Sequence, residues 1–368
     1  MSASASSSAA KGTVLNFNLS SADIERIAEA LIAQDKKLQD SVAAEANPTF
    51  ANVIVPIATL HNEQLADGCV IAFLQNVSTN KDVRDASSAA NEKLKAYEIE
   101  CKMRVDVYRA VRAVSDNPDE MASLGPEDHR LVEKIEQELR HYGHALSKEK
   151  REHLGKVKTR LSELAIKFKR NINEGDNRAV FMREELEGLP SDFFEGRATE
   201  PVNGQEGFVV TTKNPDFFAV MGKAKREETR KSMYLVRSQR CPENIPILQE
   251  AVGLRLEAAQ LLGYKTHAEF ALENKMAKEP AAVLEFIANL RSRVNVLAEK
   301  ELNEVVALKK ADMEAAGKVY TDFYGWDSRY YSNLVKKQKH NVDSEVVKQY
   351  FPIKEVTRGM LEIYQNML

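Results

Sequence analysis

Apolar residues recur at helical spacing through most of the first 173 residues, and this periodicity constrains the fold more than any other feature of the sequence. Between residues 21 and 33, for example, Ile24, Ile27 and Leu31 fall on one helical face. Residues 82–116 continue an amphipathic pattern that contains neither proline nor glycine. The pattern predicts a mainly α protein built as a multi-helix bundle. The sequence contains no internal repeat of 20 to 50 residues, so a solenoid is not expected.

The helical pattern breaks between residues 176 and 224, where glycine and proline become frequent. Two short runs there, 179–182 and 208–212, are typical of strands. We therefore predict a small β excursion within a helical protein. The predicted domains are a disordered tail at 1–15, an N-terminal helical domain at 16–224 that ends in the β excursion, and the start of a second helical domain at 225–368.

The composition is that of an ordinary globular protein, with 43% hydrophobic and 29% charged residues. The 52 basic and 55 acidic residues leave a net charge of −3, which gives no general attraction to nucleic acid. No apolar run reaches the length of a membrane span, and the serine-rich N-terminus lacks the apolar core of a secretory signal. We expect a cytoplasmic protein with no nucleic-acid partner and no membrane partner.

The three cysteines are far apart and form no Cys-x-x-Cys pair, which favours reduced thiols over a disulfide framework or a zinc ribbon. Cys241 lies in a polar segment between Arg240 and Pro242, so we expect it to be the most exposed of the three. Cys69 lies in an apolar stretch, and we expect its thiol to be buried and slower to react.

None of the seven histidines begins a His-Glu-x-x-His motif, the arrangement that places two zinc ligands and a general base on one helix face. His141 and His144 have a spacing that could chelate a metal, but solvent-facing histidines near a helix end are the favoured interpretation. His61–Glu63 and His267–Glu269 place each pair on opposite sides of a helix, so a shared site is not expected. We therefore assign no catalytic, cofactor-binding or metal-binding residue in this chain.

Residues 240–280 predict a helix, a tight corner and a second, shorter helix. Asn244 is expected to cap the first helix, Gly263 to end it, and Thr266 to cap the next. The expected apolar stripe of the first helix consists of Leu248, Val252, Ala259 and Leu262, with Ala258 and Leu261 beside it. Arg255 interrupts the stripe. An arginine that packs its stem and sends its head to water is favoured over a buried ion pair.

Two further segments have a simple structural interpretation and a less favoured functional one. The basic run from Lys148 to Arg170 overlies regularly spaced apolar residues, which indicates an amphipathic helix with a solvated face rather than a nucleic-acid or membrane surface. The aromatic residues between Tyr320 and Tyr331 are expected to pack in a core at a corner, and a peptide-contacting surface is the alternative.

Several separated blocks resemble one family in the correct order. Residues 242–250 (PENIPILQE), 261–264 (LLGY) and 276–278 (MAK) resemble the zinc metallopeptidase family of thimet oligopeptidase, neurolysin and saccharolysin. The segments 326–331 (WDSRYY) and 350–352 (YFP) agree with that assignment, and 72–87 (AFLQNVSTNKDVRDAS) looks most like the fungal member, saccharolysin. The resemblance covers nearly everything after about residue 16 and corresponds to the N-terminal portion of the family only.

The resemblance implies a zinc metalloendopeptidase that hydrolyses short cytosolic peptides and uses one zinc ion. In such enzymes two helical domains flank a deep channel, so this segment is expected to form channel wall. The His-Glu-x-x-His motif and the third ligand are expected downstream of Leu368. The isolated chain is therefore predicted to be inactive and to bind no zinc, and the complete enzyme is predicted to be a monomer.

The resemblance also bears on a thiol and on the last helix. Members of the family are thiol-sensitive, which makes Cys241 a candidate redox-sensitive residue. The segment 355–368 presents an apolar face with no obvious cover, and we expect its partners to lie in the missing part of the enzyme. A non-catalytic helical scaffold or interaction protein is the alternative function.

Overall fold

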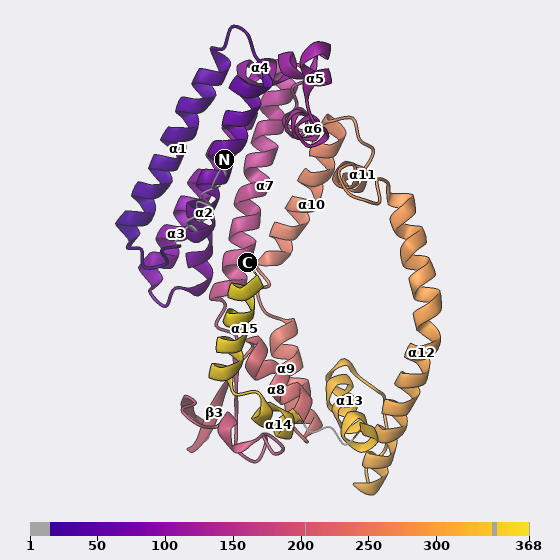
Figure 1. Cartoon of the computed structure of the whole chain (residues 1–368). Helices are drawn as coiled ribbons and strands as arrows, with labels where there is room; N and C mark the ends of the chain where they lie inside the picture. Colours follow the sequence, from indigo (N-terminus) through magenta and orange to yellow (C-terminus); the bar gives the residue numbers. More distant parts are fainter. Residues whose placement is uncertain (1–14, 203, 341–343, 368) are drawn as a thin grey trace, which may run out of the picture. The chain divides into compact units, whose positions relative to one another are not determined.

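The computed structural model describes residues 15–202, 204–340 and 344–367. The prediction of a mainly helical protein with a small sheet is confirmed (Figure 1). The chain divides into two compact units, which we describe separately. Unit 1 comprises residues 1–173 and 243–280, and unit 2 comprises residues 174–242 and 281–368. The domain boundary expected at residue 224 stays a prediction.

Unit 1 is built from helices alone. They are α1 (Ser21–Ala43), a π-helix (Phe50–Ile54), α2 (Val55–Val77), α3 (Lys81–Lys102), α4 (Val105–Ser115), α5 (Pro118–Ser123), α6 (Pro126–Arg140), α7 (Lys148–Glu174), α10 (Asn244–Leu261) and α11 (His267–Leu272). Side chains satisfy the free N–H groups at several starts: Ser20 and Asp23 form a reciprocal cap on α1, and Thr49 and Asn52 do the same for the π-helix.

Three apolar clusters hold unit 1 together. Helices α1, α2 and α3 share one around Ile24 and Ile71, both fully buried. The end of α1, the π-helix, α4 and α6 share a second around Val53 and Val111. Helices α7 and α10 meet through Leu154, Val157 and Ala258.

Unit 2 begins with a three-stranded antiparallel sheet made of β1 (Arg178–Phe181), β2 (Thr199–Val202) and β3 (Gln205–Thr211), in the order β1-β3-β2. Phe208 pairs with Phe181 on one side and with Thr199 on the other. Both strands predicted from the sequence are present, and β2 is an addition that Pro201 and the neighbouring turn concealed. Because β2 is an edge strand, it tolerates this proline.

The remaining elements of unit 2 are helical. They are a 3₁₀ turn (Ser191–Phe193), α8 (Asn214–Lys223), α9 (Glu227–Ser238), α12 (Pro280–Ala315), α13 (Gly325–His340), α14 (Ser344–Val347), a second 3₁₀ turn (Lys348–Tyr350) and α15 (Ile353–Met367). Its apolar core joins the sheet to α8 and α9 around Phe181, Val210 and Met233. Within the described residues, no helix is long and apolar enough to cross a membrane.

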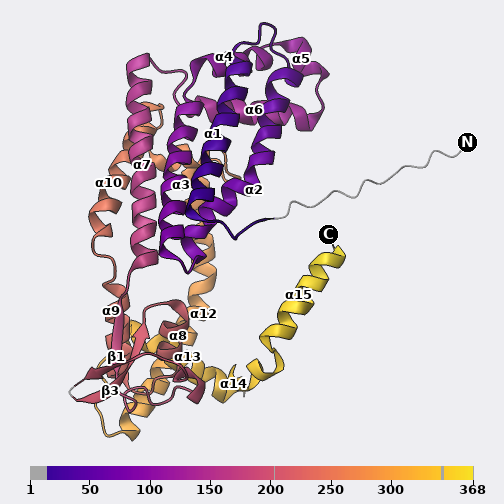
Figure 2. The same cartoon turned by 90° about the vertical axis from the view of Figure 1, so that its left-hand side faces the viewer.

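Helix α15 buries none of its described residues. Figure 2 shows it extending away from the rest of unit 2. Its polar face is satisfied by Arg358, which pairs with Glu355 and Glu362. Its apolar face is at least 44% exposed at each of Val356, Met360, Leu361, Ile363, Tyr364 and Met367. The expectation of an uncovered face is confirmed for these six positions, and Leu368 lies outside the described residues.

The prediction for α10 was wrong in two respects. Asn244 does not cap it: its amide donates to the Phe168 carbonyl at 3.1 Å and its side chain is buried. Leu248 and Val252 are 51% and 56% exposed, because α10 packs against α7 on the side of Leu254 and Ala258. The other part of the predicted stripe is confirmed, since Ala258 and Ala259 are buried. Arg255 is exposed, as expected.

The two loop features predicted after α10 are confirmed. Gly263 has a φ of 91°, the left-handed conformation that ends a helix. The Thr266 side chain accepts the Glu269 N–H at 3.2 Å. The amphipathic stretch 82–116, in contrast, is two helices rather than one, because the chain turns at Met103 between α3 and α4.

Candidate functional site

Metal-binding chemistry was the first function to test on the structure. Across the described ranges, no group of three or more His, Cys, Asp or Glu side chains is placed to hold a metal ion. The described residues therefore do not form a zinc site.

The two histidines at metal-like spacing face different partners. The His141 imidazole contacts the Glu273 carboxylate, which also accepts a hydrogen bond of 2.9 Å from the Tyr264 hydroxyl. His144 stacks on Tyr108, with ring centroids 4.3 Å apart, and its Nε2 lies 2.9 Å from the Lys102 carbonyl oxygen. They do not chelate a common ion. The expectation that both face solvent was wrong, since both rings are half-buried, and burial lowers the pKa of His144.

The His141–Glu273 contact lines a cavity of about 200 Å³. Burial alone would raise the pKa of Glu273, but hydrogen bonds from Tyr264 and His141 outweigh it and lower this pKa below the ordinary value. The volume is below that of typical small-molecule sites. The arrangement fixes α11 to the end of α6. Phe270 on α11 packs against His141, with 4.9 Å between the ring centroids.

The other two His–Glu pairs also do not form sites. His61 and Glu63 are both exposed on α2. The Glu269 carboxylate accepts the Lys265 N–H at 2.8 Å and so belongs to the start of α11. Burial lowers the pKa of the His267 imidazole, and within the described part of the chain this ring forms neither a hydrogen bond nor an ion pair with Glu269.

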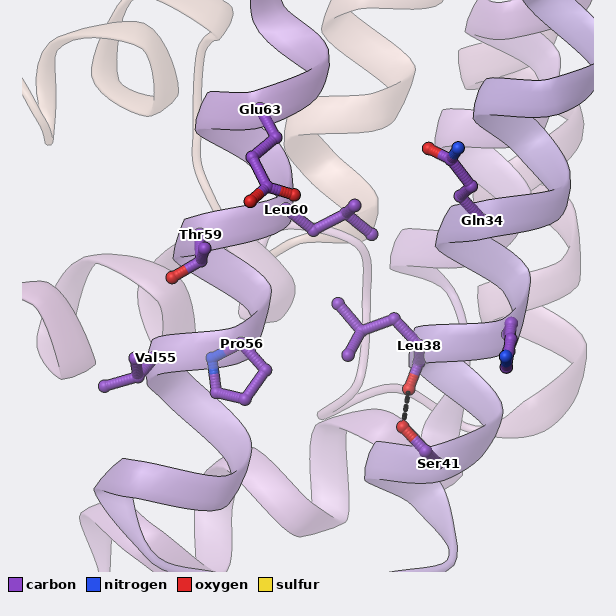
Figure 3. Close-up of a pocket in the computed structure, with 9 residues that line it drawn as sticks. Gln34, Leu38, Ser41, Val55, Pro56, Thr59, Leu60 and Glu63 are labelled. Atoms are coloured by element: carbon purple, nitrogen blue, oxygen red, sulfur yellow. Dashed lines mark hydrogen bonds between the residues drawn. The ribbon is translucent and has the colours of Figure 1, made fainter. Parts of the chain in front are cut away.

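A larger groove, of about 510 Å³, opens between α1 and α2 (Figure 3). Leu38 and Leu60 point toward each other across it, and Val55 and Pro56 line its α2 side. Its only charged lining residues are Lys37 and Glu63. The groove is mainly apolar, and although Ser41, Thr59 and Glu63 line it, the lining contains no histidine that could activate a hydroxyl group.

The most unusual charge arrangement lies in unit 2, where two cations share one carboxylate in the interior. Arg230 on α9 and Lys309 on α12 both pair with Asp327 on α13, at 3.0 and 2.6 Å. All three side chains are at most 1% exposed. Glu227 adds a second carboxylate, whose Oε1 lies 3.1 Å from the Lys309 Nζ. The same oxygen accepts a hydrogen bond from the Trp326 indole N–H.

The backbone completes this cluster. The Arg230 guanidinium donates to the carbonyl oxygens of Ala224, Lys225 and Trp326 at 2.9 to 3.2 Å. Burial by itself would lower the pKa of Lys309, but its hydrogen bonds to Asp327 and Glu227 raise it. Every charge is therefore neutralised by a partner, which is the condition under which buried ion pairs persist. The cluster ties three helices together and has the properties of a structural support rather than a reactive centre.

The aromatic residues of this region pack around the same cluster. The Tyr330 ring lies 4.2 Å from the Arg230 guanidinium, and Tyr324 stacks on Trp326 with centroids 4.5 Å apart. Tyr331 is 5% exposed, and burial raises its pKa. The interpretation as core packing is confirmed for Tyr331, whereas Tyr324 is 36% exposed. Sequence reasoning found these aromatic residues but missed Arg230, Lys309 and Glu227, because no local spacing links residues 80 to 100 positions apart.

The basic run on α7 is also explained by packing. Leu154, Val157 and Leu164 are buried beneath it. Several of its charges pair on the surface: Arg160, for example, binds both carboxylate oxygens of Glu250, at 2.6 and 3.0 Å. The interpretation as an amphipathic helix with a solvated face is confirmed.

The predicted order of cysteine exposure was wrong. Cys241 is buried at 9% exposure, in a left-handed backbone conformation with a φ of 54°, whereas Cys69 is exposed. Helix α2 has two apolar faces and packs only one. Cys69 lies on the other face, one turn after Leu65 and one turn before Phe73, which are 52% and 48% exposed. The redox sensitivity of Cys241 stays a prediction.

Comparisons with known proteins agree with the resemblance found in the sequence. Residues 220–368 match the model of peptidase family M3. Saccharolysin of Saccharomyces cerevisiae is 31% identical over 357 residues, which are 96% of this chain and 50% of the relative. A thimet-like oligopeptidase of Dictyostelium discoideum is 32% identical over 96% of this chain and 54% of its own length. Oligopeptidase A of Salmonella typhimurium is 27% identical over 94% of this chain and 52% of its own length.

These matches extend through both units, and the family match contains Asp327, Lys309 and Arg230. The chain spans about half the length of the curated relatives that it matches. On these grounds the chain belongs to peptidase family M3.

Proposed function

We propose that these 368 residues are the N-terminal part of a zinc metalloendopeptidase that hydrolyses short peptides in the cytoplasm. The observation that carries the proposal is the alignment of nearly the whole chain with one half of three proteins, two called oligopeptidases and one called saccharolysin. One zinc ion in the complete enzyme would supply the Lewis acid and the activated water for hydrolysis. We expect its ligands to lie in the rest of the complete enzyme, since no group of three or more His, Cys, Asp or Glu side chains among the described residues is placed to hold a metal ion.

The part played by this segment is that of channel wall. Its helices are long, and the buried Arg230–Asp327–Lys309 cluster fixes α9, α12 and α13 to one another without using any group that a reaction would need. A wall of rigid helices admits an extended peptide and excludes a folded protein. The complete enzyme is proposed to act as a monomer.

Uncovered apolar faces support an enzyme part over a self-sufficient scaffold. Besides α15, helix α12 leaves most of its apolar side chains uncovered. Those at least 49% exposed are Leu284, Phe286, Ile287, Leu290, Val294, Val296, Leu297 and Leu302. Contiguous exposed apolar surface of this kind marks an interface. A second half of the peptidase fold would cover it.

The experiment is a fusion of this chain to the C-terminal half of saccharolysin, assayed on a short internally quenched peptide. We expect cleavage that a chelator abolishes and zinc restores. The matched control fuses the same half to an unrelated helical domain, and we expect no cleavage. A fusion that unfolds cooperatively and retains zinc, yet cleaves nothing, would contradict the proposal.

A further inference from the structure

Lys158 on α7 occupies an unusual place in unit 1. Its half-buried ammonium lies 4.1 Å from the centroid of the Tyr142 ring. A second ammonium, that of Lys102 at the end of α3, lies 5.7 Å from the same ring. Two cations thus lie near one aromatic ring, which follows the end of α6.

The nearby carboxylates are taken by the other lysine. Lys102 pairs with Glu98 and with Glu138, each at 2.6 Å. The second oxygen of Glu98 is held by Lys95 at 2.7 Å. Lys158 makes no ion pair and no side-chain hydrogen bond with any residue that the structure describes. The ring is its nearest electrostatic support, and such a contact compensates a half-buried charge only in part.

The titration of these groups follows from that geometry. Burial, and then repulsion by Lys102, lower the pKa of Lys158 to about 8, against a weaker opposite effect of Glu138 and Glu98. The hydrogen bonds to Glu138 and Glu98 raise the pKa of Lys102 despite its burial. Burial also raises the pKa of Tyr142, so this ring stays neutral. At pH 7.5 about a quarter of Lys158 would be the free amine, against about 0.1% for an ordinary lysine.

We propose that Lys158 is a site of Nε-acylation by small acyl thioesters. The ammonium first loses a proton to water. The nitrogen lone pair of the amine then attacks the thioester carbonyl carbon, so a C–N bond forms and the C–S bond breaks. The thiolate leaves and takes up the proton that the nitrogen releases, which gives one amide and one thiol.

The product suits the surroundings better than the reactant does. A neutral amide ends the repulsion between the two ammonium groups and breaks no ion pair, because Lys158 has none among the described residues. Acylation of Lys102, in contrast, would leave Glu138 without its cation and Glu98 with Lys95 alone. The arrangement therefore selects Lys158 over its neighbour.

The test incubates the purified 368-residue chain with acetyl-coenzyme A and follows each lysine by mass spectrometry. Lys156 is the matched control, since it lies two residues away on α7 and is exposed. We expect Lys158 to be acetylated at least ten times faster than Lys156 at pH 7.5. The larger free-amine fraction of Lys158 is partly offset, because an amine of lower pKa is less nucleophilic and because the Lys158 side chain is half-buried. The rate should rise with pH to a midpoint near 8.

Three further measurements distinguish the effect of the folded surroundings of Lys158 from simple exposure of its side chain. In 8 M urea the advantage of Lys158 should vanish. The Lys102→Met variant should bring its rate close to that of Lys156, because Glu98 and Glu138 then become available to pair with Lys158. The Tyr142→Phe variant keeps the ring and should leave the rate unchanged. Equal rates for Lys158 and Lys156 in the folded chain, a midpoint near 10, or an advantage that persists in urea would overturn the proposal.

Discussion

Replacing Asp327 with alanine should destabilise unit 2 more than any other single surface or core charge change in that unit. The carboxylate lies within 3.0 Å of both Arg230 and Lys309, and it accepts the Tyr324 N–H at 3.0 Å. With all three side chains at most 1% exposed, water cannot replace it. Two buried cations would remain, opposed only by Glu227, which is 29% exposed.

The size of the effect follows from the cost of an unpaired buried charge. Removing one partner of a buried pair costs about 3–5 kcal/mol. A whole domain is stable by about 5–15 kcal/mol, so the variant should lose a large fraction of its free energy of unfolding. The raised pKa of Lys309 gives the sign of the pH dependence. Its stabilising contribution is complete below about pH 10.5 and is lost as the pH rises through the folded-state pKa, so in the unmodified chain this contribution should be the same at pH 6 and pH 8.

The assay is urea unfolding followed by the fluorescence of Trp326, the only tryptophan in the chain, which donates to Glu227 inside the cluster. The matched control is Asp192→Ala, which removes an exposed ion pair with Lys348. This variant should change the urea midpoint of unfolding by no more than the experimental error of the measurement. The triple variant Arg230→Met, Lys309→Met, Asp327→Leu should recover most of the loss. A loss below about 1 kcal/mol in Asp327→Ala would refute the reasoning, because an unpaired buried charge costs more than that.

Three further predictions concern other parts of the chain. Cys69 should react with a maleimide faster than Cys241, as peptide mapping would show, because its thiol is exposed; equal rates would contradict the structure. Helix α15 should exchange its amide hydrogens fast while α3 and α4 exchange slowly, and the exposed apolar face should make the chain self-associate in sedimentation; uniformly slow exchange in a monomer would show that α15 is covered. The lowered pKa of Glu273 stabilises the fold above the ordinary carboxyl pKa of 4.5, and this contribution is lost as the pH falls through the lower folded value. Exchange in α11 should therefore accelerate below about pH 4, and much less so in Glu273→Gln; the same acceleration in both would contradict this role.

The helical character and the β excursion could be predicted because they depend on local patterns. Periodicity is repeated in every turn of a helix, and Thr266 and Gly263 act on neighbouring residues, so their roles follow from the sequence. The face that a helix buries depends on what packs against it. Helix α10 carries apolar residues on more than one side, and spacing alone could not show that Ala258 and Ala259 are buried while Leu248 and Val252 are exposed.

The same limit explains the cysteines and the charge cluster. Local polarity suggested that Cys241 is exposed and Cys69 buried, but the turn before α10 packs inward and α2 leaves one apolar face uncovered. The Arg230–Asp327 pair joins residues 97 positions apart, and Lys309 reaches the same carboxylate from a third helix. No spacing rule connects such residues, so only the folded chain reveals them.

The central claim, that this chain is a peptidase segment whose metal site lies outside the described residues, is tested most directly by measuring bound zinc and turnover together. The purified 368-residue chain would be loaded with zinc, dialysed, analysed for metal and assayed on a quenched peptide. The account predicts substoichiometric zinc and no cleavage above the no-protein control. One tightly held zinc per chain, with peptide cleavage that a chelator abolishes, would contradict it.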